Sequence, residues 1–133
     1  MGDVNSINKV ILMGYICSEI KTGETKDNHK KYTKFQMATN EAFYERGTKG
    51  SKKRVEYHNI ISWGSLAKII SDYGKKGMQV AVEGKLRSTR WVDRDGRNRH
   101  LMEVNVDQFI FVGKRQDYSE NIKEKENNND DPF

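Results

Sequence analysis

Apolar and polar residues alternate along several short segments of this chain, which is the pattern of β-strands buried on one face. Within one of them, Val55, Tyr57, Asn59, Ile61 and Trp63 fall on a single face by the period of two. A turn signal, Asp95-Gly96, joins the last two segments. The pattern predicts five strands, within residues 10–13, 32–43, 55–63, 80–91 and 102–112.

One segment has the period of a helix instead. Leu66, Ile69, Ile70 and Tyr73 are spaced i, i+3, i+4 and i+7 between Ser65, a candidate N-cap, and Gly74, a candidate C′ residue. Residues 22–31 and 45–53 read as polar loops. Three strands, a helix and two strands are the order of an OB-fold, so we expect an all-β, five-stranded Greek-key barrel with one short helix between strands 3 and 4.

The apolar pattern stops at Lys114, which divides the chain into a barrel domain over 1–113 and a tail over 114–133. The tail has too few apolar residues to offset the entropy of ordering, so we expect it to be disordered. Four of the 24 basic residues and six of the 19 acidic ones fall in the tail, giving it a formal charge of −2 and the first 113 residues +7. A basic body with an acidic end predicts a polyanionic partner for the barrel and a different partner for the tail.

Several classes of protein are disfavoured by composition. The chain has no apolar run of membrane-spanning length and no signal peptide pattern, and a lone Cys17 excludes an internal disulfide. We therefore expect no membrane association and a reducing, cytoplasmic location. The three histidines lack metal-ligand spacing and there is no Walker loop, so the sequence predicts no metal, no cofactor and no enzymatic activity.

Aromatic residues beside basic ones are the main functional signal. Phe43, Tyr57, Trp63 and Trp91 stand at strand ends or near basic segments that include Lys53-Arg54 and Arg90. Cationic side chains neutralise phosphates, and flat rings stack on bases that a duplex would hide. Each ring alone could equally be a core residue, but four of them in a +7 domain favour a binder of single-stranded nucleic acid.

The chain from Asn8 to about Val112 resembles the bacterial single-stranded DNA-binding protein family, and the terminus resembles the acidic tip of that family. The resemblance implies a homotetramer that coats single-stranded DNA, without sequence preference, in replication, recombination and repair near the nucleoid. It also implies that the tip recruits replication and repair enzymes. The matching segments are Asn8–Gly14, Ala38–Phe43, Glu56–Gly64, Lys76-Gly77, Val82–Arg87, Trp91–Asp93 and Asp130–Phe133.

The resemblance also assigns roles to single residues. Where the family usually has Trp, Trp, Phe and Trp, this chain has the four stacking candidates Phe43, Tyr57, Trp63 and Trp91. His58 matches a histidine that the family uses at its subunit interface. The residues implied for DNA contact also include Lys76, Arg87 and Arg90, to which the basic pattern adds Lys53 and Arg54; those implied for partner binding are Asp130, Asp131, Pro132 and Phe133.

Three other functions remain open at this point. An OB-fold RNA-binding or translation protein would share the barrel but has no reason to end in Asp-Asp-Pro-Phe. A protein-binding adaptor would contact oligonucleotides without the salt dependence of phosphate binding. A nuclease would need a cluster of carboxylates that the sequence does not suggest.

Overall fold

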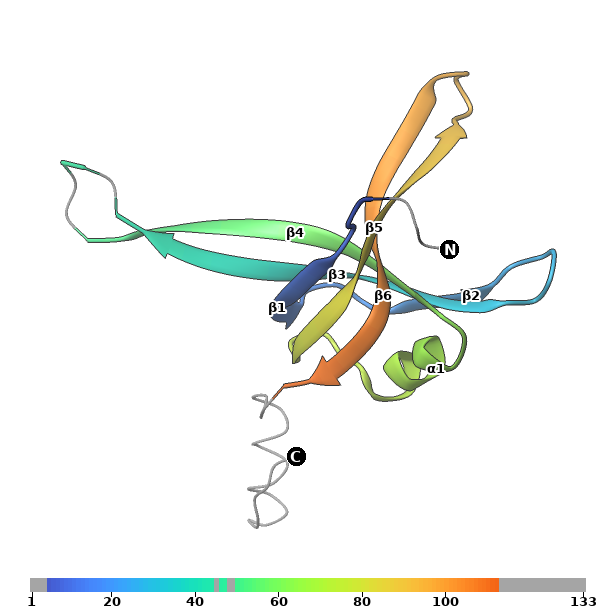
Figure 1. Ribbon diagram of the computed structural model, residues 1–133, viewed down its shortest axis with the longest axis horizontal. Helices are drawn as coiled ribbons and strands as arrows, with labels where there is room; N and C mark the ends of the chain where they lie inside the picture. Colours follow the sequence, from blue (N-terminus) through green and yellow to red (C-terminus); the bar gives the residue numbers. More distant parts are fainter. Residues whose placement is uncertain (1–4, 45, 48–49, 113–133) are drawn as a thin grey trace, which may run out of the picture.

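The computed structural model describes residues 5–44, 46–47 and 50–112 (Figure 1). Six strands and one helix are formed within these residues. In chain order they are β1 (Val10–Ile16), β2 (Lys21–Glu24), β3 (Lys31–Phe43), β4 (Lys52–Trp63), α1 (Gly64–Tyr73), β5 (Gln79–Val92) and β6 (Asn98–Phe111).

The strands form one sheet in the order β1-β5-β6-β4-β3-β2, and an additional pairing of β1 with β3 closes it into a barrel. The parallel pairing joins β4 to β6, while the other pairs are antiparallel. The expected five-stranded OB-fold barrel is confirmed as β1, β3, β4, β5 and β6, with α1 between the third and fourth of these strands.

The short strand β2 was not expected, because the sequence predicted a polar loop over 22–31. It has no alternating apolar residues and is largely exposed. Its order comes instead from pairing with the start of β3, from Lys21 opposite Lys34 to Glu24 opposite Lys31. Backbone pairing of this kind leaves no hydrophobic signal in the sequence.

Gly14 allows the barrel to close. Up to Tyr15 strand β1 pairs with β5, and at Tyr15 and Ile16 it pairs with β3 as well. A Cβ atom at Gly14 would overlap the carbonyl oxygen of Ala38 on β3. The glycine therefore permits the close approach of two backbones at the point where β1 changes partners.

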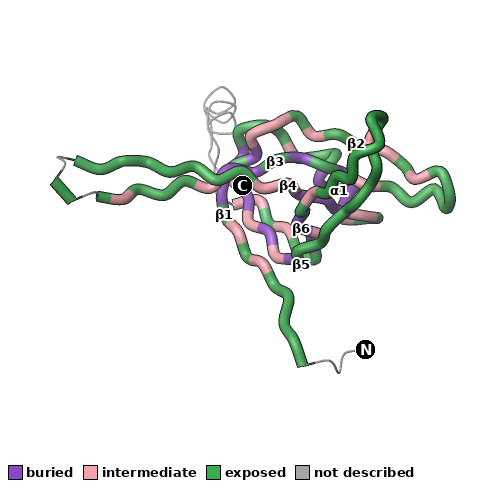
Figure 2. The backbone as a smooth tube through the Cα atoms, turned by 90° about the horizontal axis from the view of Figure 1, so that it is seen from above, coloured by how far each residue is buried: buried purple, intermediate pink, exposed green. Residues whose placement is uncertain are grey.

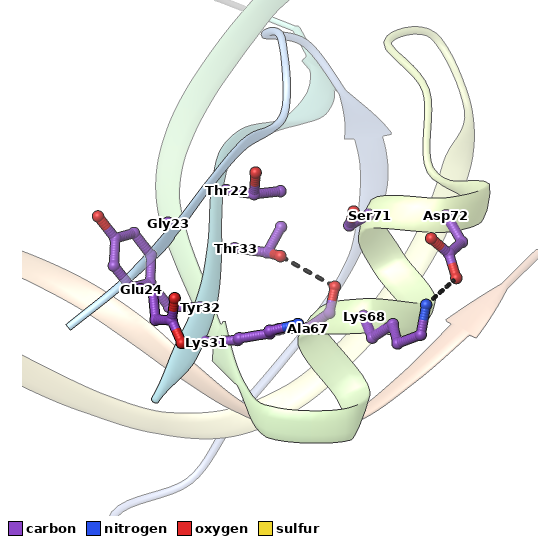
Figure 3. Close-up of a pocket in the computed structure, with 10 residues that line it drawn as sticks. All are labelled: Thr22, Gly23, Glu24, Lys31, Tyr32, Thr33, Ala67, Lys68, Ser71 and Asp72. Atoms are coloured by element: carbon purple, nitrogen blue, oxygen red, sulfur yellow. Dashed lines mark hydrogen bonds and ion pairs between the residues drawn. The ribbon is translucent and has the colours of Figure 1, made fainter. Parts of the chain in front are cut away.

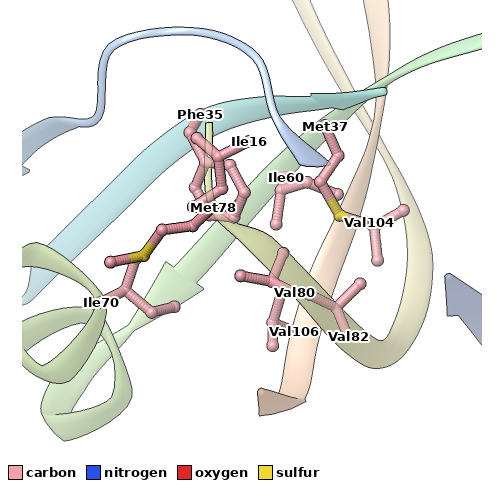
Figure 4. Packing of buried hydrophobic residues seen from close by; sticks show 10 residues of the cluster. All are labelled: Ile16, Phe35, Met37, Ile60, Ile70, Met78, Val80, Val82, Val104 and Val106. Carbon is pink, nitrogen blue, oxygen red and sulfur yellow. The ribbon is translucent and has the colours of Figure 1, made fainter. Parts of the chain in front are cut away.

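The core lies where the strands of the barrel cross (Figure 4). Buried residues concentrate at this crossing, while the outer parts of the β3–β4 and β5–β6 hairpins are exposed (Figure 2). The hairpins extend from the barrel as two arms in different directions (Figure 1). The buried cluster consists of Ile16, Phe35, Met37, Ile60, Ile70, Met78, Val80, Val82, Val104 and Val106.

Helix α1 begins at Gly64, two residues earlier than an N-cap at Ser65 would place it, and Ser65 is not its N-cap. The N-cap is Trp63, which has an extended backbone and makes no side-chain capping bond. Gly64, with φ of +65°, turns the chain directly from β4 into the helix, so no separate capping residue is used. At the other end, Gly74 is the C-cap and not the predicted C′ residue; its φ is −79°, and it donates its N–H to the carbonyl of Ile70 at 2.7 Å.

The helix covers β3 and leaves a cavity of about 370 Å³ between α1 and the β2–β3 hairpin (Figure 3). The Thr33 hydroxyl donates to the carbonyl of Ala67 at 2.9 Å, and the Lys68 ammonium lies 3.1 Å from a carboxylate oxygen of Asp72. These polar groups are already paired within the fold, so the cavity offers little chemistry of its own.

Two sequence-based expectations concern features of the whole chain. No helix in the described part of the chain is long and apolar enough to cross a membrane. The tail over 114–133, with the tip residues Asp130, Asp131, Pro132 and Phe133, lies outside the described residues. Its predicted disorder and its role remain predictions.

Candidate nucleic-acid interface

Four strands contribute side chains to a shallow depression of about 280 Å³ on the outer face of the barrel. Strand pairing explains why they meet: Tyr32 is opposite Trp63, Ile61 is opposite Asn105, and Arg87 is opposite Glu103. We call this depression the groove. It is lined by Tyr32 and Lys34 of β3, Ile61 and Trp63 of β4, Arg87 and Thr89 of β5, and Glu103 and Asn105 of β6.

An aromatic pair with two lysines forms one end of the groove. The rings of Tyr32 and Trp63 lie edge to face, with centroids 5.6 Å apart and planes at 61°. The Lys30 ammonium lies 5.2 Å from the Trp63 centroid, and the Lys34 ammonium lies 5.6 Å from the Tyr32 centroid. Both distances are within the range of cation–π attraction. Rings and cations, the two groups that a single strand requires, are therefore in contact here.

A buried carboxylate lies at the floor of the groove. The Glu103 side chain is only 6% exposed, although its neighbours are cationic. One of its oxygens accepts a hydrogen bond from the Thr89 hydroxyl at 3.1 Å, and the other lies 3.6 Å from the Lys34 ammonium. Glu103 on β6 thus holds Lys34 of β3 and Thr89 of β5 in place.

The same face continues along β4 into the β3–β4 arm. Asn59 precedes Ile61 by two residues and accepts a hydrogen bond from the Gln36 amide at 3.2 Å. Tyr57 comes next and is 63% exposed, and Lys53 lies further out on the same face. Trp63 is six positions along the strand from Tyr57, which corresponds to about 20 Å. The spacing leaves room for several nucleotides of single-stranded nucleic acid between the two rings.

The face also continues along β5 into the other arm. Trp91 lies four residues beyond Arg87, so the period of two places both on one side of the sheet. The Trp91 ring is 46% exposed, and its partner across the hairpin is Arg99. Arg99 Nε donates to the Asp93 carboxylate at 2.8 Å, which fixes the guanidinium at the base of the turn.

The turn between β5 and β6 is ordered by the same carboxylate. Asp93 accepts a hydrogen bond from Arg99 and others from the backbone N–H groups of Arg97 and Asp95. The Arg99 guanidinium first, and then the backbone donors, lower the pKa of the Asp93 carboxyl below its ordinary 3.8. Asp93 is therefore ionised at neutral pH and holds the end of the arm that carries Trp91.

Other predicted contact residues lie elsewhere. Phe43 shares a face with the buried Phe35 and Met37, opposite to that of Tyr57, and the Arg54 guanidinium covers its ring at 4.7 Å. Arg90 lies on the face of β5 opposite to Trp91, because the two residues are adjacent in the strand. Lys76 is exposed in the turn between α1 and β5. The structure thus groups Trp63, Arg87, Tyr57, Lys53 and Trp91 on one face, and places Phe43, Arg54, Arg90 and Lys76 outside it.

Comparison with known proteins identifies the relatives of this chain. The family model described as the single-strand binding protein family matches residues 7–112. The chain belongs to this family. It is 31% identical over 112 residues to single-stranded DNA-binding protein 1 of Xylella fastidiosa (strain 9a5c), a match that covers 84% of this chain and 82% of the relative.

A solved structure of another member has the same fold. The fold is similar, with a TM-score of 0.74 and 25% identity, to the structure described as a Plasmodium falciparum SSB complex with ssDNA. The match covers 84% of this chain and 99% of that one. A barrel of this kind has therefore been observed with single-stranded DNA in a relative of the single-strand binding family.

The predicted interface residue His58 lies at the base of the β3–β4 arm of this single-strand binding protein. Its Nε2 atom is 2.9 Å from the Thr39 hydroxyl, and the pair is partly buried. The contact lies within one chain, so the role of His58 between subunits stays a prediction. Within the described part of the chain, no group of three or more His, Cys, Asp or Glu side chains is arranged to hold a metal ion.

Sequence reasoning missed Tyr32, Lys34, Lys30 and Glu103. The criterion that selected the other rings also applies to Tyr32, which follows Lys30-Lys31 and precedes Lys34. No sequence pattern indicated Glu103, because its position in the groove depends on the register between β5 and β6.

Proposed function

We propose that this chain binds single-stranded DNA without sequence preference, through the face that runs from Tyr57 past the groove to Trp91. The observation that carries the proposal is the continuity of rings and cations on one face, centred on Trp63 and Arg87 in the groove. The names of its relatives support the same activity. The role is non-catalytic and requires no cofactor.

Binding has two physical components. Rings that stack on bases contribute about 1–3 kcal/mol per base with little dependence on base identity, as in OB-folds that bind single-stranded DNA. Lysine and arginine side chains neutralise phosphates and release condensed counterions, which makes the affinity depend on salt. Duplex DNA offers the phosphates but not the base faces, so the first component selects single strands.

The cellular role is a further part of the proposal. A protein of this kind coats single strands exposed during replication, recombination and repair, in the cytoplasm at the nucleoid. We propose that the tip, Asp130-Asp131-Pro132-Phe133, recruits the enzymes that process those strands. A rigid proline, an aromatic ring and two acidic side chains suit an apolar pocket rimmed by basic residues.

A homotetramer is the proposed assembly, and an exposed apolar patch supports it. Ile11, Met13 and Ile110 are each more than half exposed. Met13 is opposite Ala81, and Ala81 is opposite Ile110, so the three strands β1, β5 and β6 present one apolar row. An apolar patch of this kind marks a contact with another protein surface, here a second copy of the chain.

The assembly is tested by light scattering after size-exclusion chromatography. The wild-type chain is expected at four times its 15.5 kDa mass. Met13→Glu, which places a charge in the apolar row, is expected to give a smaller species, and His58→Ala tests the other predicted contact. A wild-type monomer would contradict the tetramer.

The binding activity is tested by fluorescence anisotropy with labelled oligo-dT, a duplex and oligo-U, at low and high salt. We expect tight, salt-dependent binding to oligo-dT and much weaker binding to the duplex. Preference for oligo-U would favour an RNA-binding role. Salt-insensitive or absent binding to all three would contradict the proposal and favour a protein-binding adaptor.

A further inference from the structure

The position of Tyr32 between β2 and β4 suggests a role that neither the family pattern nor the aromatic candidates of the sequence include. Tyr32 is half-buried and lies in a row with Gly23 on one side and Trp63 on the other. A Cβ atom at Gly23 would overlap the phenol end of Tyr32. Because Gly23 has no side chain, the ring can lie across the backbone of β2, and Tyr32 and Gly23 are neighbours in Figure 3.

The ring adjoins the groove on its other side. Tyr32 lies edge to face with Trp63 at 5.6 Å, so the two rings form one continuous aromatic surface. The Lys34 ammonium is 5.6 Å from the Tyr32 centroid, and the Lys30 ammonium is 5.2 Å from that of Trp63. Each ring therefore has a cation at its face. Lys34 is also paired with the Glu103 carboxylate at 3.6 Å, so a phosphate beside a stacked base competes with Glu103 for its ammonium.

A structural role explains these contacts less completely. The core of the barrel is formed by the opposite face of β3, where Phe35 and Met37 are buried. Tyr32 lies instead on the outer face, beside the groove residues Lys34 and Trp63. Among the described residues, no hydrogen bond to the Tyr32 hydroxyl fixes the ring within the fold.

We propose that Tyr32 is a base-contacting residue, and that Tyr32 and Trp63 together hold neighbouring bases while Lys30 and Lys34 bind the phosphates on either side. This inference rests on the proposed single-stranded DNA binding and specifies where the strand enters the groove. It adds a ring on β3 to the predicted stacking residues and extends the path of the bound DNA from β4 toward β2.

The test uses the full chain and the variants Tyr32→Phe, Tyr32→Leu and Tyr73→Leu. Tyr73 is an exposed tyrosine on α1 outside the groove, so Tyr73→Leu is the matched control. Each is titrated with an oligo-dT of about eight nucleotides, within the site size of one OB-fold, and with an abasic strand of equal length. The abasic strand keeps the phosphates and removes the bases, which separates stacking from charge.

We expect Tyr32→Leu to weaken oligo-dT binding about tenfold, equivalent to about 1.4 kcal/mol, and to leave binding of the abasic strand unchanged. Tyr32→Phe and Tyr73→Leu should bind oligo-dT as the wild type does. Equal loss on both strands, or no loss on oligo-dT, would overturn the inference. Failure of the wild type to bind oligo-dT would instead overturn the proposed function.

A second measurement avoids any effect of the substitution on folding. The wild-type chain is crosslinked by light to an oligonucleotide that carries 5-iododeoxyuridine, and the modified residue is identified by mass spectrometry. A crosslink at Tyr32 supports the inference. Crosslinks confined to Trp63, Tyr57 or Trp91, with none at Tyr32, would overturn it.

Discussion

The Lys34 ammonium on β3 lies 3.6 Å from the buried carboxylate of Glu103 on β6, inside a groove otherwise suited to phosphates. The pair has two opposing effects on a polyanion. It fixes Lys34 beside the aromatic pair, and it also places a negative charge where phosphates approach. Because half of the Lys34 side chain is exposed, the attraction between the two is screened by water.

Glu103→Gln is expected to tighten binding of oligo-dT about threefold at low salt. The amide keeps the size and a hydrogen-bond acceptor for Thr89, while the negative charge is lost and Lys34 is released for phosphate. An effect of this size is about 0.7 kcal/mol, within the range of a partly exposed ion pair. The measurement is anisotropy at two salt concentrations, and the gain should shrink at high salt. Weaker binding of Glu103→Gln at low salt would contradict this, because it would show that the positioning of Lys34 by Glu103 matters more than the repulsion between Glu103 and the phosphates.

Stacking and charge are separated by Trp63→Leu and Arg87→Gln. Removal of the Trp63 ring is expected to weaken oligo-dT binding by about 1–3 kcal/mol, with an unchanged salt slope. Arg87→Gln is expected to flatten the slope of log K against log salt by about 0.7, the value for one phosphate of a single strand. Affinity is measured over a series of salt concentrations. A flatter slope for Trp63→Leu would contradict the assignment of roles.

The two faces of the β3–β4 arm make a direct comparison possible. Tyr57 is on the face of the groove, whereas Phe43 is on the other and is covered by Arg54. Tyr57→Leu is expected to weaken oligo-dT binding about tenfold, by the loss of one stacked base, and Phe43→Leu to change it little. A larger loss for Phe43→Leu would mean that the strand wraps around the arm and contacts both faces.

The Asp93 carboxylate predicts a pH effect on the β5–β6 arm. Its pKa is lowered in the folded chain, by the Arg99 guanidinium above all, from the 3.8 of the unfolded chain. The stabilisation is therefore fully present at neutral pH, begins to decrease as the pH approaches 3.8, and is lost as the pH falls through the lower folded pKa. A carboxyl titration by NMR is expected to give a midpoint for Asp93 below 3.8, and Arg99→Gln should raise it. A midpoint at or above 3.8 would contradict the bonding described for the turn.

Closure of the barrel is tested at Gly14. Gly14→Ala forces β1 and β3 apart at Ala38 and is expected to lower the free energy of unfolding by about 1–3 kcal/mol. Urea denaturation measures the change, with Asn40→Ala, at an exposed position of β3, as the control. Equal stability of Gly14→Ala and wild type would show that the close contact at Ala38 relaxes easily.

The barrel was predictable because its signals are local. Alternation in 55–63, the helical spacing of Leu66 to Tyr73 and the turn at Asp95-Gly96 each follow from neighbouring residues, and each led to an element of the structure. Strand β2 was not predicted because it is held by backbone pairing alone. The predicted N-cap at Ser65 is wrong because Gly64, in the left-handed region, already makes the turn from β4 into α1.

The candidate site was less predictable, since it depends on which strands are paired and in which register. Phe43 and Tyr57 look equivalent along the sequence, but antiparallel pairing of β3 with β4 places them on opposite faces. Glu103 and Tyr32 enter the groove only when β6 and β3 lie on either side of β4. Relations of this kind involve residues far apart in the chain, and hydrophobic periodicity does not contain them.

The most direct test of the account uses the two tryptophans of the chain separately. Trp91→Phe leaves Trp63 as the single tryptophan reporter, and Trp63→Phe leaves Trp91. Titration of Trp91→Phe with oligo-dT is predicted to quench the Trp63 fluorescence strongly and saturably, while a duplex of the same length has little effect. Saturable binding of oligo-dT, seen by anisotropy, without any change in Trp63 emission would contradict the claim that the groove face holds the bases.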